Sequence, residues 1–314
     1  MTAESPTKIL EGALARQGLA GAKARLAIPA VASPLHRGVA QQGFQVTPTA
    51  GPALFCKLPA ADQEGLLAPA EAAVMARLAG GLGVAPDVAW YDAPAAVLAT
   101  AWLPDGWRYA KVEDLRRPDC LRAVLAALRR LQAAPVTPDL PCPDAGARLQ
   151  RQDALLRDLP VERPPNYDWL MDQAHQALQA LDPSAQAQAP CHLGAIASNV
   201  MLGPDGGLLL VDFDQAGLGD PLHDLGILLT EAFDFEDEWL AALAPLYGEA
   251  AQAAVNRGRL WGLVDDLAWG QWGFICHARG LRPDIEYFKY ASWRFLRATQ
   301  TAGDWGFERR LRQL

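Results

Sequence analysis

The stretch of sequence that decides the fold runs from Cys191 to Gly226 and reads CHLGAIASNVMLGPDGGLLLVDFDQAGLGDPLHDLG. It contains two short apolar runs, Val200–Leu202 and Leu208–Val211, with an Asp-Gly turn signal in the five residues between them. Such a pattern predicts an antiparallel β-hairpin. The residue before the first strand and the residue after the second strand then lie opposite each other, and these residues are Asn199 and Asp212.

The open end of this hairpin brings together one amide oxygen and one carboxylate. Mg²⁺ prefers oxygen ligands of this kind and fills its remaining positions with water and nucleotide phosphates. We therefore predict that Asn199 and Asp212 hold Mg²⁺. Hairpin geometry alone leaves an alternative open, in which the two side chains only cap turns.

Several residues of this stretch follow a composite pattern: H-x-D-x-x-x-x-N, a short hairpin, and then I-D-F-x-x-A-x-x-G-D-P-x-x-D. The chain matches it with His192, Asn199, Val211–Asp214, Ala216–Pro221 and Asp224. In these residues the chain resembles the aminoglycoside phosphotransferase and choline kinase superfamily, which shares the protein-kinase fold. The resemblance implies a kinase that uses ATP and Mg²⁺, with Asn199 and Asp212 as metal ligands and Asp212 in the place of the DFG aspartate.

Two acidic residues of the same pattern, Asp220 and Asp224, are better explained by structural roles. Asp220 precedes Pro221 at an expected helix start, where an N-cap aspartate is favoured. Asp224 is expected to brace the loop. We therefore assign neither residue a part in catalysis.

One position of the family pattern lacks its usual residue. Counting back from Asn199 places Gly194 where the family carries its catalytic aspartate, and residues 192–199 contain no carboxylate. A positioned general base contributes about 10²- to 10⁴-fold in rate. Phosphoryl transfer depends mostly on positioning and on metal charge, so the loss need not abolish it. His192, whose counterpart in the family is structural, and Asp214 are the candidates for a replacement base.

The first third of the chain is predicted to contain nucleotide-binding elements. Residues 52–58 alternate like a strand that carries Lys57, and Pro69 opens a helix that ends at Gly80-Gly81. Glu71 falls on the apolar face of this helix, which a solvated glutamate would avoid. The resemblance implies an ion pair in which Lys57 holds the α- and β-phosphates and Glu71 fixes the lysine. The alternative is an acid placed favourably in a first helical turn.

The resemblance implies two further nucleotide contacts. Residues 35–41 fall where relatives carry a phosphate-covering loop, and Gly38 is the glycine that remains there. Arg37 either contacts phosphate or is exposed. The stretch Ala99–Trp102 resembles the hinge whose backbone reads adenine, which places Trp102 at the nucleotide.

The C-terminal part of the chain supplies the predicted substrate residues. Residues 256–277 are expected to form a helix that places four side chains in one narrow arc: Trp261, Asp265, Trp269 and Trp272. Indole faces beside a carboxylate commonly bind quaternary ammonium groups. The resemblance to bacterial choline kinase relatives extends to Tyr287. A cationic amine substrate is one interpretation, and an ordinary core helix with packed aromatic residues is the other.

Composition disfavours several classes of protein. The formal charge of −8 works against nonspecific nucleic-acid binding, because phosphate backbones need a basic surface. With 51% hydrophobic and 20% charged residues, no window approaches the apolar length of a bilayer span, so membrane insertion is not expected. The five cysteines are widely spread without a C-x-x-C pair, a pattern that favours a reducing cytoplasm.

These observations predict an α+β, bilobal, protein-kinase-like fold. Residues 1–103 are expected to form a small nucleotide-binding lobe with an antiparallel sheet. Residues 104–314 are expected to form a larger, mainly helical lobe with the metal site and substrate pocket, and with helices at 166–181 and 236–254. The predicted function is ATP- and Mg²⁺-dependent phosphoryl transfer to a hydroxyl of a small, in one interpretation amine-bearing, metabolite. The alternative is a pseudokinase that binds a nucleotide or metabolite in a regulatory role.

Overall fold

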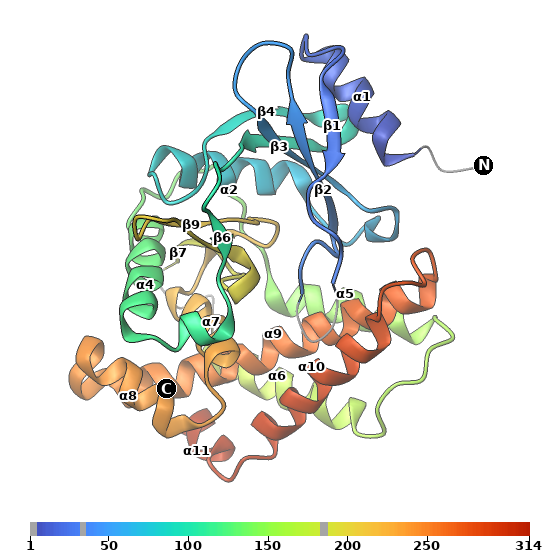
Figure 1. Ribbon diagram of the computed structural model, residues 1–314. Helices are drawn as coiled ribbons and strands as arrows, with labels where there is room; N and C mark the ends of the chain where they lie inside the picture. Colours follow the sequence, from blue (N-terminus) through green and yellow to red (C-terminus); the bar gives the residue numbers. More distant parts are fainter. Residues whose placement is uncertain (1–4, 32–35, 183–187) are drawn as a thin grey trace.

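The computed structural model describes residues 5–31, 36–182 and 188–314. It has two lobes, a smaller one built on an antiparallel sheet and a larger one built mainly from helices (Figure 1). The prediction of a bilobal α+β fold is therefore confirmed. The chain leaves the last strand of the sheet at Ala101 and passes through Leu103–Gly106, and we propose the lobe boundary between residues 103 and 104.

The sheet of the smaller lobe has the strand order β1-β2-β3-β5-β4, and every neighbouring pair is antiparallel. Its strands are β1 Lys23–Leu26, β2 Gln41–Thr47, β3 Leu54–Pro59, β4 Val88–Asp92 and β5 Val97–Ala101. Along β3, Leu54, Cys56 and Leu58 are buried on one face, as their alternation predicts. Helix α1 (Pro6–Arg16), which the sequence analysis did not predict, covers this face with its buried leucines.

Helix α2 (Pro69–Gly81) has the predicted ends and shares a buried cluster with Leu98 of β5. Its buried residues are Ala72, Ala73, Met75, Ala76, Ala79 and Gly80. The prediction that Glu71 lies on the apolar face is wrong, because Glu71 is exposed. The helix packs through its small alanine side chains, and this orientation turns Glu71 toward solvent.

The hairpin expected in the 191–226 stretch is present, and a third short strand pairs with it. These strands are β6 Arg108–Tyr109, β8 Val200–Leu202 and β9 Leu208–Leu210, all antiparallel. A second ribbon pairs β7 (Ala189–Cys191) with β10 (Gly217–Gly219). Both ribbons lie between the large sheet and the helices (Figure 1).

The register of the hairpin differs from the prediction by one residue. Val200 pairs with Leu210, so Asn199 lies opposite Val211, and the Val211 N–H donates to the Asn199 carbonyl at 2.9 Å. The expectation that Asn199 directly faces Asp212 is therefore wrong. The second strand ends at Leu210, one residue earlier than its apolar run.

The larger lobe is organised around the long, largely buried helix α9 (Ala251–Arg279), whose apolar residues pack with those of α5, α6 and α10. The remaining helices of this lobe are α3 Val112–Leu115, α4 Pro118–Gln132, α5 Ala145–Arg157, α6 Tyr167–Leu181, α7 Pro221–Ala232, α8 Glu236–Tyr247, α10 Tyr287–Ala302 and α11 Phe307–Arg312. Short 3₁₀ helices occur in both lobes: η1 Ala61–Gln63, η2 Ala93–Ala95, η3 Ala197–Asn199 and η4 Gly248–Ala250. The predicted helices at 166–181 and 256–277 are confirmed. In the described part of the chain, no helix combines the length and apolar character that crossing a bilayer requires.

The predicted single helix at 236–254 is wrong. The chain breaks between α8 and α9 at Gly248, whose φ is 54°. This left-handed conformation costs glycine little, because glycine has no Cβ. The break lets α9 start in a new direction.

A buried charge cluster around Asp62 joins the two lobes. Asp62 has no exposed surface, and it accepts hydrogen bonds from Arg282 Nε at 2.8 Å and from the Tyr287 hydroxyl at 2.7 Å. The neighbouring Gln63 Oε1 accepts the indole N–H of Trp272 at 2.8 Å. Burial alone would raise the pKa of Asp62, but hydrogen bonds, led by those from Arg282, outweigh burial and lower it below 3.8.

We expect Asp62→Ala to destabilise the protein by about 3 kcal/mol at pH 7. This is the low end of the cost of breaking a buried ion pair, because Arg282 keeps 16% of its side chain exposed. Urea unfolding checks the value, with the exposed Asp284→Ala as the matched control. Because the folded pKa of Asp62 is depressed, its contribution is present above pH 3.8 and is lost as pH falls through the folded pKa. Equal stabilities of the wild type and Asp62→Ala at pH 7 would contradict this assignment.

Candidate active site

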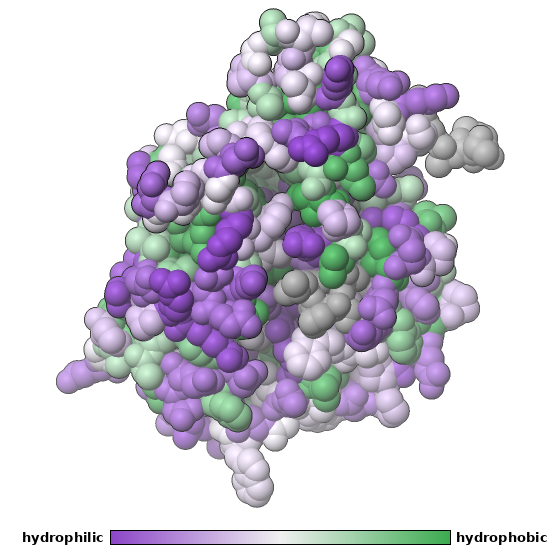
Figure 2. Space-filling view, in the orientation of Figure 1, coloured by the Kyte–Doolittle hydropathy of each residue, from purple (hydrophilic) through white to green (hydrophobic). Residues whose placement is uncertain are grey.

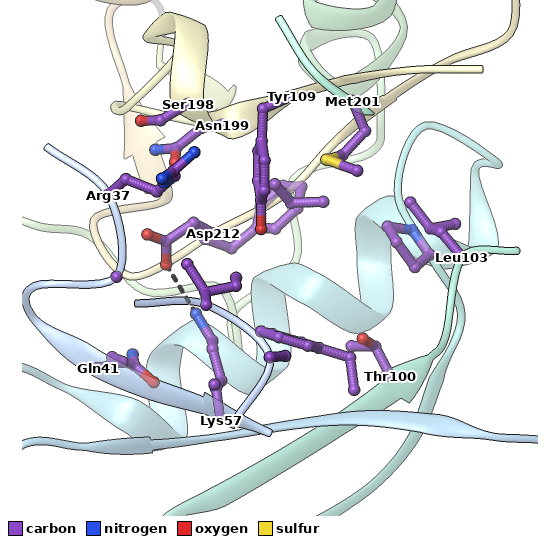
Figure 3. Close-up of a pocket in the computed structure, with 18 of the residues that line it drawn as sticks. Arg37, Gln41, Lys57, Thr100, Leu103, Tyr109, Ser198, Asn199, Met201 and Asp212 are labelled. Atoms are coloured by element: carbon purple, nitrogen blue, oxygen red, sulfur yellow. Dashed lines mark hydrogen bonds and ion pairs between the residues drawn. The ribbon is translucent and has the colours of Figure 1, made fainter. Parts of the chain in front are cut away.

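A cavity of about 270 Å³ lies between the lobes, and residues of both lobes line it (Figure 3). In the space-filling view of Figure 2 the surface is hollowed between the upper and lower lobes. The predicted site residues that line the cavity are Gly38, Lys57, Trp102, Asn199 and Asp212. The structure thus brings the predicted metal ligands and the predicted nucleotide residues other than Glu71 to one place.

Lys57 connects the two lobes inside this cavity. Its ammonium lies 2.7 Å from Asp212 Oδ1 and 2.6 Å from Asp214 Oδ1. Lys57 is on β3, on the face opposite the α1 cluster, which is why it points toward the larger lobe. The Asp212 side chain keeps 38% of its surface exposed and that of Asp214 only 8%, so Asp212 is the carboxylate available to a ligand.

The charges of this cluster depend on one another. Burial would lower the pKa of Lys57, but the two carboxylates outweigh burial and raise it. Burial would likewise raise the pKa of Asp212, but the Lys57 ammonium lowers it. Burial and the nearby negative charge of Asp212 raise the pKa of Asp214 to about 6. At neutral pH Lys57 and Asp212 therefore form a charged pair.

Asn199 and Asp212 lie at the same end of the cavity, close to Arg37 (Figure 3). Asp212 has a φ of 68°, a left-handed conformation that aspartate tolerates better than most residues. The Asn199 side-chain N–H donates to the Gly194 carbonyl at 2.9 Å, which leaves its amide oxygen as an acceptor. One amide oxygen and one exposed carboxylate are a donor set that suits Mg²⁺.

The described residues contain no cluster of three or more His, Cys, Asp or Glu side chains that could hold a metal by itself. A cation at Asn199 and Asp212 would therefore need water and phosphate oxygens to complete its coordination. Mg²⁺ in phosphoryl-transfer sites is commonly bound in this way. The residues present fit a nucleotide-dependent metal site better than a permanent one.

The position of the missing base has room for a side chain. A Cβ on Gly194 would lie 3.5 Å from His192 Nδ1 and 3.7 Å from Asn199 Nδ2, which are ordinary van der Waals distances. Gly194 is also not in the left-handed region that would require glycine. The absence of a carboxylate here is therefore a property of the sequence and is not imposed by the backbone.

The two candidate replacement bases, His192 and Asp214, are not among the residues that line the cavity. His192 is fully buried, its Nε2 lies 3.0 Å from the Val211 carbonyl oxygen, and its ring packs on Phe213. Burial lowers its pKa. Asp214 is held by Lys57 and by the Gln41 amide. These contacts favour a structural role for both residues.

The loop before β2 covers one wall of the cavity. Gly38 has a φ of 62°, and a Cβ there would lie 3.1 Å from Ile28, so this position favours glycine. The Arg37 guanidinium lies 5.7 Å from the centre of the Tyr109 ring, at the cavity wall. His36 and Gln41, which also line the cavity, belong to the predicted phosphate-covering loop, whereas Tyr109 of β6 was not predicted as a cavity residue.

The hinge differs in detail from the prediction. Trp102 lines the cavity, but its backbone N–H donates to the Ala53 carbonyl at 3.1 Å, and that of Ala101 donates to Asp87 at 2.8 Å. These two N–H groups are therefore not free to bind adenine. Leu103, which also lines the cavity, carries the next N–H along the chain.

The predicted ion pair between Lys57 and Glu71 is not formed. Lys57 pairs with Asp212 and Asp214, and the exposed Glu71 does not line the cavity. This corrects the expectation taken from the resemblance. In this chain the carboxylates of the larger lobe fix the lysine.

The predicted substrate residues gather beside the cavity but do not line it. The Trp272 ring lies 5.2 Å from that of Trp269 and 5.4 Å from that of Tyr287, and the polar atoms of Trp272 and Tyr287 bind Gln63 and Asp62. Trp261 turns away, because its indole N–H donates to Asp220. Asp265 is buried 3.4 Å from Arg294, and burial raises its pKa to about 6.

The structural roles predicted for the two other acids are confirmed. Asp220 is the N-cap of α7 and accepts the Leu222 N–H at 2.9 Å. Asp224 accepts the N–H groups of His192 and Leu193 at 3.1 and 2.6 Å. Asp224 therefore holds the turn that precedes the metal-site hairpin.

Comparison with protein-family models places this chain in the phosphotransferase enzyme family, whose model matches residues 31–261. The chain belongs to this family. A choline/ethanolamine kinase family protein from Mesorhizobium loti is 26% identical with a TM-score of 0.72, over 95% of this chain and 97% of that one.

Two further similar structures are more distant in sequence. The choline kinase LicA from Streptococcus pneumoniae is 15% identical (TM-score 0.72, 95% and 98% of the two chains covered). LicA in complex with AMP is 16% identical (TM-score 0.75, 96% and 99%). No curated protein sequence matches the chain. These similarities confirm the protein-kinase-like fold that the 191–226 stretch predicts.

Proposed function

We propose that this protein transfers the γ-phosphoryl group of ATP, with Mg²⁺, to a hydroxyl group of a small metabolite. The observation that carries the proposal is the joining of Lys57 to the partly exposed Asp212 in a cavity that Asn199 also lines. A lysine, an asparagine and an aspartate that line one cavity can position the phosphates and neutralise their charge, and phosphoryl transfer depends on both. Membership of the phosphotransferase family and the AMP complex of LicA support the proposal that this chain binds a nucleotide.

Each of the cavity residues predicted from the sequence would have a defined role in this reaction. Asn199 and Asp212 would hold Mg²⁺, which supplies charge neutralisation at the phosphates when bound. Lys57 would bind phosphate oxygens while its salt bridges keep it charged. Gly38 would let the loop backbone approach the phosphates. No carboxylate at position 194 takes the proton of the acceptor hydroxyl, so turnover should be slow.

The second candidate function is a pseudokinase that binds nucleotide or metabolite without efficient turnover. Gly194 favours it, as do the contacts that hold His192 and Asp214 in structural roles. The cytoplasmic location and the amine-bearing acceptor stay predictions. The aromatic residues Trp269 and Trp272 support an amine, whereas the pairing of Asp265 with Arg294 removes the free carboxylate that an amine would need.

A MgATP turnover assay with choline, ethanolamine, aminoglycosides and sugars separates the two functions. We expect Mg²⁺-dependent ADP formation that requires an acceptor and is lost in Lys57→Met. Acceptor-dependent turnover in the wild type would exclude the pseudokinase. Binding of MgADP without any turnover would overturn the proposed transfer and support the pseudokinase.

A further inference from the structure

The buried ring of His36 occupies the aromatic recess that the sequence assigned to a substrate. His36 lies in the loop before β2, and only 9% of the residue is exposed. Its imidazole centre lies 4.5 Å from Trp269, 5.0 Å from Trp272 and 5.2 Å from Tyr290, all on α9 and α10. A side chain of the smaller lobe thus fills the space between three aromatic rings of the larger lobe.

Two arginines use the aromatic faces that remain. The Arg148 guanidinium lies 4.8 Å from the centre of Trp269, and that of Arg294 lies 5.2 Å from the centre of Tyr290. Arg294 also pairs with Asp265, the carboxylate expected to attract a cationic substrate. Part of the attraction that these rings offer to a cation is therefore already used within the protein.

The loop that carries His36 is fixed at several points. The Ser198 hydroxyl donates to the His36 carbonyl at 2.6 Å. Three residues further on, the Val39 carbonyl accepts from Arg282, and Val39 is fully buried in a cluster with Trp272 and Tyr287. The imidazole is thus held in the recess by its backbone as well as by its ring contacts.

The surroundings of His36 keep its imidazole uncharged. Arg294 and Arg148 face His36 from the larger lobe, and Asp212 faces it from the cavity side. Burial, followed by Arg294, lowers the pKa of His36 to about 3, so the imidazole is neutral. The recess as built holds an uncharged ring.

We propose that His36 is a specificity-determining residue whose imidazole fills the aromatic recess and excludes acceptor alcohols that carry a quaternary ammonium group. The inference rests on the proposed function, because His36 can select an acceptor only if phosphoryl transfer takes place in the adjoining cavity. His36 lines both the recess and this cavity. The acceptor of this protein would then be a small hydroxyl compound without such a group. This deepens the proposed function by removing choline-like alcohols from the substrate class.

Equilibrium binding of choline, measured by titration calorimetry, tests the proposal without relying on turnover. The wild type should show no saturable binding. His36→Ala, which empties the recess, should bind choline saturably through the three exposed rings, at least about tenfold more tightly than the upper limit measured for the wild type. His36→Phe, which keeps a ring in the recess, should behave like the wild type. Adding Trp269→Leu to His36→Ala should remove the gain.

Saturable choline binding by the wild type would overturn the proposal. This measurement does not depend on whether the variants fold. The proposal also fails if His36→Ala gains no affinity, or if His36→Phe gains as much. MgADP binding by the same proteins is measured in parallel. Saturable choline binding by a wild-type protein that also binds MgADP would contradict the role of His36 alone, whereas absence of MgADP binding to the wild type would contradict the proposed function.

Discussion

Replacing Gly194 with aspartate is expected to raise the rate of phosphoryl transfer from MgATP by about 10²- to 10⁴-fold, the contribution of a positioned general base. The backbone allows the change, because the atoms nearest to a Cβ at this position belong to His192 and Asn199 and lie 3.5 to 3.7 Å away. Steady-state ADP formation with a panel of small alcohols checks the prediction.

Gly194→Asn is the matched control for this variant. It adds a side chain of nearly the same shape that cannot accept the hydroxyl proton as a base, so its rate should stay close to that of the wild type. If Gly194→Asp folds, binds MgADP and is no faster than Gly194→Asn, the account of the missing base is wrong.

Replacing Asp212 with asparagine is expected to lower acceptor-dependent turnover on the order of 10³-fold. Charge stabilisation by a bound metal ion contributes several kcal/mol to such reactions, and about 1.4 kcal/mol corresponds to a factor of ten. The variant should fold, because asparagine also tolerates the left-handed conformation of residue 212. Lys57 keeps one partner, since Asp214 lies 2.6 Å away.

The measurement is best made in the Gly194→Asp background, where the rate is expected to be high enough for a large loss to be seen. Asp205→Asn, an exposed acid in the turn of the same hairpin, is the control and should leave the rate unchanged. A loss of less than about tenfold in Asp212→Asn would show that the carboxylate does not carry the metal.

Much of the fold could be predicted from sequence because its signals are local. The alternation of Leu54, Cys56 and Leu58, and the Pro69 start and Gly81 end of α2, each depend on a few neighbouring residues. The hairpin at 200–210 was predictable from its apolar runs and turn. Its register was not, because the apolar run continues to Val211 whereas the paired strand ends at Leu210.

The contacts between distant segments could not be predicted. Glu71 lies on a helix that buries its alanine face, and the helix sequence alone does not show which face docks on the rest of the lobe. Lys57 contacts Asp214, which lies 157 residues further along the chain, because the two lobes pack against each other.

The substrate residues show the same limit. Trp269, Trp272 and Tyr287 do cluster, as their helical spacing indicates, but the sequence did not predict what they contact. His36 reaches them from a loop with no periodic pattern, and Asp62 reaches Tyr287 from 225 residues away. Long-range contacts of this kind decide whether an aromatic cluster is a binding site or part of the core.

The most direct test of the account is calorimetric titration of the wild-type protein with ADP in the presence of Mg²⁺ and again with EDTA. The account predicts that Mg²⁺ tightens ADP binding by about tenfold or more, since Asn199 and Asp212 alone offer too few ligands for the ion. Equal affinity for ADP with and without Mg²⁺ would contradict the claim that these two side chains form a nucleotide-dependent metal site.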